Sequence, residues 1–216
     1  MKTLFFTFAI AVLLINTPSQ AQDNQRFMQA MGATLGEMGQ ANDPAAMQEV
    51  ANKFERIGNS ETAEWLPNYY AALTYTLIAT KQKEAAATDQ YLDKADSFIE
   101  KMANQNGVAL DEVEVLKAQV AMMRIAVDGP ARWTKYGAAF ETAIAKAKVI
   151  NAQNPRAYAL KAMMVFNTPV QFGGGAEKAC PEIQVASQKF ADFKSASPIA
   201  PNWGLEQVEG MKKACK

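Results

Sequence analysis

Histidine is absent from all 216 residues of the chain. Its absence excludes serine–histidine and cysteine–histidine catalytic pairs, histidine general bases and histidine metal ligands together. The sequence also lacks the G-x-x-x-x-G-K-[ST] spacing, which excludes a P-loop. We therefore expect a protein that is not an enzyme, with no catalytic residues, no metal and no cofactor.

The chain also lacks an excess of charge of either sign, because 22 basic residues balance 22 acidic ones. Nucleic acids and anionic membranes both select a basic protein surface. The balance therefore predicts no nucleic-acid partner and no anionic membrane surface as the main partner.

Long apolar runs are scarce, and the clearest one lies close to the N-terminus, at residues 4–15. It is shorter than the roughly 20 residues that a membrane-spanning helix needs. Lys2 precedes the run, and the small residues Ser19 and Ala21 fit a signal-peptidase site. We predict a signal peptide at 1–21, cleaved before Gln22. We also predict export to a bacterial periplasm or beyond, with no stable membrane insertion after cleavage.

Cysteine is rare, and Cys180 and Cys215 are the only two. In an oxidising compartment such a pair favours a disulfide. This bond would close a loop of about 35 residues and stabilise the fold by about 3 kcal/mol. Two unpaired and mostly buried thiols are the alternative.

The sequence is rich in helical periodicity, with abundant alanine and almost no alternation of β-branched residues. Apolar residues recur every three or four positions, and Pro, Gly and Asn stand where helices would begin or end. The pattern predicts about eight to nine helices, at residues 24–39, 44–57, 64–81, 85–102, 111–127, 131–150, 155–166, 177–193 and 205–215. A Gly-rich loop at 167–175 and an extended segment at 195–203 separate the last of them. Short connections between helices predict an all-α fold of antiparallel hairpins.

Part of the chain repeats with a fixed period, since the offsets from 70 to 114 and from 114 to 158 are both 44 residues. Small residues recur in one register, at Thr74, Ala118 and Ala162. A small side chain at a fixed position lets neighbouring helices approach closely, as stacked hairpins require. A chance recurrence among alanine-rich helices is the alternative.

This repeat resembles the tetratricopeptide repeat family, whose hairpins stack into a right-handed solenoid. The resemblance covers residues 65–193 and rests on two aromatic-then-small pairs, Tyr70 with Thr74 and Tyr158 with Ala162. Glu114 departs from the aromatic position, and the period exceeds the family's usual length of about 34.

The resemblance extends to exported bacterial proteins of this type, and it implies a fold without implying a reaction. It divides the chain into a signal peptide (1–21), an N-terminal helical pair (22–62), a repeat array (63–194) and an extended segment with a capping helix (195–216).

In tetratricopeptide arrays the first helix of each hairpin lines a concave groove that binds a protein or peptide partner. The residues that the resemblance places there are Tyr75, Ile78, Gln119, Met122, Met163 and Phe166. They carry no charge and are mostly apolar, which suits an extended or helical peptide. Our leading hypothesis is therefore a non-catalytic periplasmic or secreted adaptor or scaffold.

The alternative is a helical protein that binds a small ligand through the Gly-rich loop and nearby aromatic residues. Glycine N–H groups and the start of the next helix can hold an anion. This possible anion or ligand site comprises Phe172, Gly173, Gly174, Gly175 and Lys178. The same glycines also have a purely structural interpretation, because a connecting turn needs positive φ angles.

Two other groups of residues have structural interpretations as well. Asp111, Glu112 and Glu114 resemble a carboxylate metal site, but acids in a first helical turn simply complement the helix dipole. Aromatic residues at helical spacing are more often core than a platform for a ligand. This group consists of Trp65, Tyr69, Tyr70, Trp133 and Tyr136.

Overall fold

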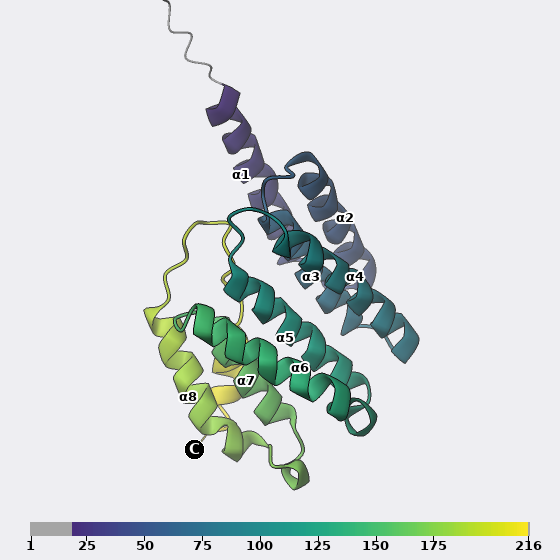
Figure 1. The fold of residues 1–216 in the computed structure, drawn as a ribbon, viewed down its shortest axis with the longest axis vertical. Helices are drawn as coiled ribbons and strands as arrows, with labels where there is room; N and C mark the ends of the chain where they lie inside the picture. Colours follow the sequence, from purple (N-terminus) through teal and green to yellow (C-terminus); the bar gives the residue numbers. More distant parts are fainter. Residues whose placement is uncertain (1–18, 216) are drawn as a thin grey trace, which may run out of the picture.

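The computed structural model describes residues 19–215, and all of their regular structure is helical (Figure 1). The helices are α1 Ser19–Met38, α2 Pro44–Ser60, α3 Leu66–Ala79, α4 Ala85–Ala103, α5 Leu110–Val127, α6 Gly129–Ile150, α7 Pro155–Asn167, the 3-10 turn η1 Val170–Phe172, α8 Ala176–Asp192 and α9 Leu205–Lys212. None of the described residues forms a strand, so the all-α prediction is confirmed. Most of the predicted signal peptide, residues 1–18, lies outside the described residues.

Asp–Pro and Asn–Pro pairs set the starts of two helices. At α2, Asp43 accepts hydrogen bonds of 2.9 Å from the N–H groups of Ala45 and Ala46, and Pro44 occupies the first helical position. At α7, Asn154 accepts a bond of 3.0 Å from the N–H group of Arg156. These caps explain why the predicted helix starts at 44 and 155 agree with the structure.

Each helix from α1 to α9 packs against the next one in the chain. In addition, α3, α5, α7 and α9 contact one another in that order, so the hairpins α3–α4, α5–α6 and α7–α8 stack in a row (Figure 1). Thr74, Ala118 and Ala162, which mark the repeat, are all buried. The right-handed solenoid of tetratricopeptide type stays a prediction.

The core is densest around α3, where every residue except Leu77 is buried. The segment 193–204 contributes to this burial, because it rises from α8 and returns to α9 across the row of α3, α5 and α7 (Figure 1). The Tyr70 hydroxyl donates to the Ile199 carbonyl of this segment at 2.9 Å. The chain therefore covers with its own extended segment the face where a groove was expected.

Cys180 of α8 and Cys215, after α9, form a disulfide, as the sequence predicted. The bond ties the last helix to α8. No helix in the described part of the chain is long and apolar enough to cross a bilayer.

Candidate ligand-binding surface

Four of the six predicted groove residues lie in the core: Tyr75, Ile78, Gln119 and Met122 are buried. Tyr75 shows the reason, because its ring stacks between Tyr91 and Phe98 of α4, with centroids 6.2 and 5.8 Å away. In the structure these four side chains therefore point toward the second helices of the hairpins. The groove prediction is wrong for them. The other two, Met163 and Phe166, are half-buried.

A buried polar network holds the extended segment over α3, α5 and α7. The Nε of Arg156 donates to both carboxylate oxygens of Glu112, at 2.9 and 3.1 Å, and its Nη1 donates to the Pro201 carbonyl at 2.9 Å. The Tyr69 hydroxyl donates to Glu112 at 2.9 Å and accepts a bond of 2.7 Å from Trp203 Nε1. This face is thus satisfied internally and leaves no groove for a peptide.

The acidic residues at the start of α5 take part in the same network. Asn154 donates to Asp111 at 2.9 Å and to Glu112 at 2.7 Å, and Asn151 donates to Asp111 at 2.8 Å. Glu114 pairs with Lys117 instead, at 2.8 Å. Within residues 19–215, no group of three or more acidic or cysteine side chains is arranged to hold a metal ion.

The Gly-rich loop uses its own backbone donors. Each N–H group of Gly173, Gly174 and Gly175 donates to a carbonyl in the segment 165–170, at 2.9 to 3.3 Å. A Cβ added to Gly174 would lie 2.3 Å from the Thr168 carbonyl oxygen, so this turn requires glycine there. The predicted anion nest is therefore wrong, because its donors are already bonded.

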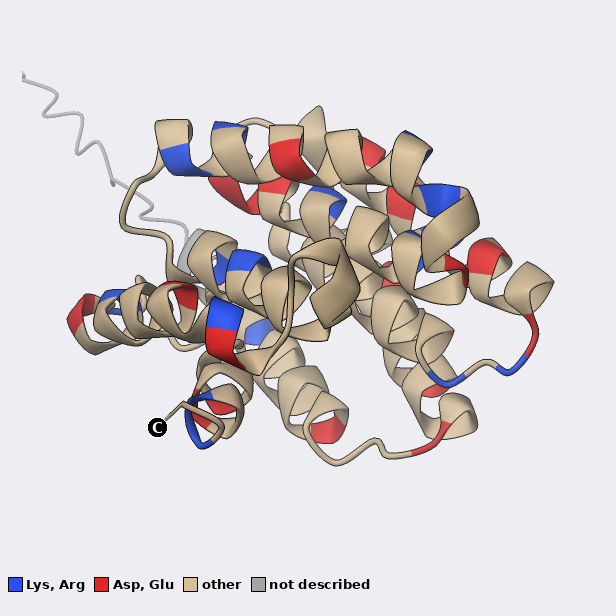
Figure 2. Cartoon of the chain, turned by 90° about the horizontal axis from the view of Figure 1, so that it is seen from below, with Lys and Arg blue, Asp and Glu red and all other residues tan. Residues whose placement is uncertain are grey.

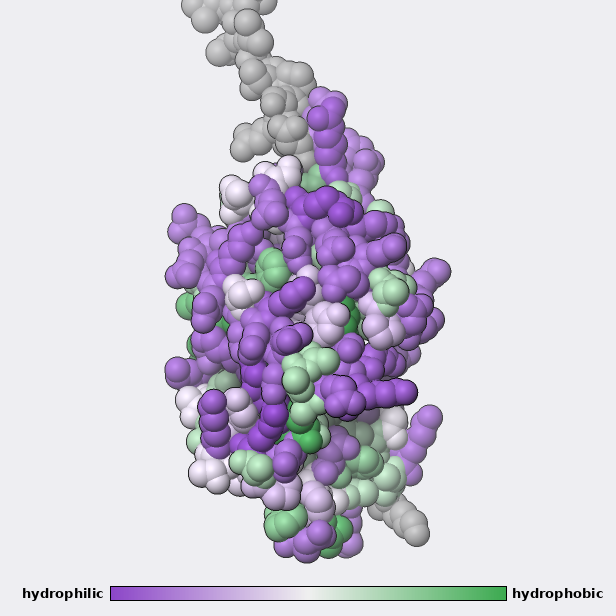
Figure 3. All heavy atoms as spheres, turned by 90° about the vertical axis from the view of Figure 1, so that its right-hand side faces the viewer, coloured by the Kyte–Doolittle hydropathy of each residue, from purple (hydrophilic) through white to green (hydrophobic). Residues whose placement is uncertain are grey.

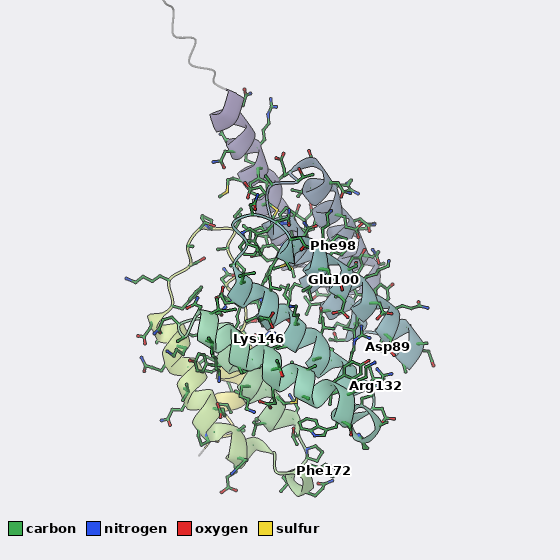
Figure 4. All side chains as sticks on the ribbon, viewed as in Figure 1. Asp89, Phe98, Glu100, Arg132, Lys146 and Phe172 are labelled. Carbon is green, nitrogen blue, oxygen red and sulfur yellow. A yellow bond between two sulfur atoms is a disulfide. The ribbon has the colours of Figure 1, made fainter. Side chains whose placement is uncertain are left out.

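The loop instead presents exposed apolar side chains that a ligand could contact. Val170 and Phe172 are 77% and 69% exposed, and Phe172 lies at the lower end of the molecule (Figure 4). Lys178, in the first turn of α8, is also exposed. Figure 3 shows apolar atoms at this lower end and along the middle of the face above it, within a hydrophilic surround.

Trp133 of α6 is a further exposed apolar side chain, and the residue is 47% exposed. Its indole ring lies against α6 over Gly137, because a Cβ added to Gly137 would be 3.1 Å from the ring. Helix α6 has 22 residues and the following α7 only 13, so the first turns of α6 extend past the end of α7. The η1 turn follows α7 at that end. We call Trp133, Val170 and Phe172 the apolar edge.

A hollow of about 340 Å³ lies between the turn from α3 to α4 and the end of α5, and α6, which carries Trp133, begins two residues after that end. Its apolar lining consists of Ala79, Ala85, Met123, Ala126 and Val127. Its polar lining consists of Thr80, Gln82, Lys83 and Thr88, so Lys83 is its single charged side chain.

An ion pair between Asp89 and Arg132 joins the residue after Thr88 of the hollow to the residue before Trp133. Arg132 Nη1 and Nη2 donate to the two oxygens of Asp89 at 2.7 and 2.8 Å, and Figure 4 shows the pair joining α4 to α6. The hydrogen bond from Arg132 lowers the pKa of the Asp89 carboxyl below its usual value. Arg124 forms ion pairs with two further acids of α4, Asp93 and Asp96, at 2.6 and 2.7 Å. Figure 2 shows basic and acidic positions interspersed over the helices that face the viewer.

The sequence pattern identified Phe172 but missed Trp133 and the hollow. Trp133 lies on the apolar stripe of α6, which predicts burial, yet it is 47% exposed. The hollow brings together residues of three helices whose mutual placement no local pattern gives.

A scan of protein-family models finds none that matches the chain, and no curated protein sequence matches it. Among solved structures, the chain is similar to the HusA haemophore from Porphyromonas gingivalis. The two share 29% sequence identity over 88% of this chain and 92% of the haemophore, with a TM-score of 0.78. The likeness is to a haemophore and not to a protein-binding adaptor, so the adaptor hypothesis is wrong. The small-ligand alternative accords with the comparison.

Proposed function

We propose that the protein binds haem or a related porphyrin as an exported carrier and catalyses no reaction. The observation that carries the proposal is the likeness to the HusA haemophore along most of both chains. A porphyrin is a flat apolar ring with a carboxylate-bearing edge. It calls for apolar and aromatic protein surface with a cation at the rim.

Two common ligands of haem iron, histidine and a free cysteine, are lacking, while eleven methionines and six tyrosines are present. Histidine is absent, and both cysteines are joined in a disulfide. Burial raises the pKa of Tyr69, Tyr70 and Tyr75, so these phenols stay protonated at neutral pH. We therefore assign most of the affinity to contact with the porphyrin ring, which makes metal-free porphyrin a ligand as well.

The apolar edge provides the surface for such contact. Exposed aromatic side chains grouped on one surface often mark a binding site. If a ring covers about 200 Å² of apolar surface there, the gain is about 5 kcal/mol. The flat indole of Trp133 against its helix suits stacking on a planar ligand.

Two features support an extracytoplasmic location for this function. The sequence predicts a signal peptide at 1–21, and the disulfide between Cys180 and Cys215 is typical of oxidising compartments.

Titration of the mature chain with haem, followed by Soret absorbance, tests the proposal. We expect saturable binding, and binding weakened at least tenfold in the double variant Trp133→Ala/Phe172→Ala. Val149→Ala is the matched control, because Val149 is 87% exposed but lies at the other end of α6. The proposal fails if haem does not bind. The surface assignment fails if the double variant binds haem as tightly as the control.

A further inference from the structure

The hollow has one polar side chain that the fold does not already use. The Thr80 hydroxyl donates to the Leu77 carbonyl of α3 at 2.7 Å, and the Thr88 hydroxyl donates to the Glu84 carbonyl before α4 at 3.2 Å. Gln82 Nε2 donates to the Ile78 carbonyl at 3.0 Å. Lys83 is exposed, and none of the described carboxylates forms an ion pair with it.

Arg132, next in sequence to Trp133, is already committed to an ion pair. Both terminal nitrogens of Arg132 are bonded to Asp89, so an incoming anion would have to displace a carboxylate. Lys83 can bind an anion without displacing a carboxylate. The hollow thus combines an apolar lining from α3, α4 and α5 with a single ammonium group in that lining, the unpaired Lys83.

We propose that this hollow binds a carboxylate carried on an apolar body, with Lys83 as the residue that recognises the carboxylate. For a porphyrin ligand, which rests on the proposed function, this is the propionate edge of the ring. The ring then extends past the Asp89–Arg132 pair toward Trp133. The volume of about 340 Å³ is at the small end of ligand pockets, which suits the edge of a porphyrin and not the whole ring.

A free fatty acid has the same chemistry, and the experiment distinguishes it from a porphyrin. The probes are protoporphyrin IX, its dimethyl ester and decanoate, each titrated against the mature chain. The variant Lys83→Met removes the charge and keeps the stem. Lys146→Met is the control, because Lys146 is exposed on α6 and lies away from the turn between α3 and α4 (Figure 4).

We expect Lys83→Met to weaken protoporphyrin IX binding up to about fivefold, while binding of the dimethyl ester and binding by the Lys146→Met control change less than twofold. Filling the hollow with Ala126→Trp weakens both porphyrins, whereas Ala145→Trp, at an exposed position of α6, weakens neither. Equal loss of acid and ester in Lys83→Met, or no loss of either, would overturn the proposal.

If no porphyrin binds at all, the proposed function fails, and the decanoate titration alone tests the carboxylate site in the hollow. Decanoate binding that Lys83→Met abolishes then assigns the hollow to a fatty acid. Absence of decanoate binding as well would overturn the carboxylate site itself.

Discussion

Arg156 and Glu112 form an ion pair in which each side chain is only 4% exposed. The pair links α5 to α7, and Arg156 also holds the extended segment through the Pro201 carbonyl. A buried charge that loses its partner costs far more than an exposed one.

We predict that Arg156→Met lowers the free energy of unfolding by about 3–5 kcal/mol, because it leaves Glu112 buried and unpaired. Urea denaturation followed by circular dichroism measures the change. Lys161→Met removes an ion pair with Glu141 at the surface, and its expected cost is below about 1 kcal/mol. Equal losses of unfolding free energy in the two variants would show that the buried pair does not stabilise the fold more than a surface pair does. The double variant Glu112→Leu/Arg156→Met should recover part of the loss.

The disulfide provides a second prediction. Replacing Cys180 and Cys215 by serine releases a loop closed across a sequence separation of 35 residues. The expected loss is about 3 kcal/mol, or a drop in Tm of roughly 6–12 °C for a chain of this size. Calorimetry with and without reductant measures it. A Tm that is the same in reduced and oxidised protein would contradict the prediction.

Alkaline pH provides a third prediction, through the tyrosines. Burial raises the pKa of Tyr75 to about 12, helped by its bond to Glu55, and burial also raises the pKa of Tyr69 and Tyr70. In the unfolded chain these phenols titrate near pH 10. Their contribution to stability is therefore complete below about pH 10 and is lost as the pH rises toward 12 and beyond.

Absorbance of tyrosinate near 295 nm checks this prediction, because the chain has six tyrosines. At about pH 11 Tyr69, Tyr70 and Tyr75 of the folded protein should still be protonated, and denaturant should release their tyrosinate signal. If these three phenols titrate near pH 10 without unfolding, the buried hydroxyls are not held as the structure shows.

Much of the fold could be predicted from the sequence because its signals are local. Asp43 with Pro44 and Asn154 with Pro155 set helix starts through capping bonds that depend on adjacent residues. The disulfide followed from the presence of only two cysteines. The buried network around Arg156 could not be predicted, because Glu112 and Pro201 reach it from distant parts of the chain.

The candidate site was harder to predict than the fold. A helix has a single apolar stripe in sequence, but burial depends on which partner covers each turn. Tyr75 was placed in a groove and is core, whereas Trp133 was assigned to the core and is exposed. The Gly-rich loop was identified correctly as a distinct feature. Its glycine N–H groups are bonded to carbonyls of the same segment, so the loop presents Val170 and Phe172 to a ligand and not its backbone donors.

The measurement that tests the central claim most directly is a calorimetric titration of the mature chain with haem and with metal-free protoporphyrin IX. Our account predicts that both bind saturably, with dissociation constants within about tenfold of each other, because ring contact and not iron coordination supplies the affinity. If neither ligand binds, the protein is not a porphyrin carrier. If haem binds and the metal-free ring does not, iron coordination dominates and the account of the site is contradicted.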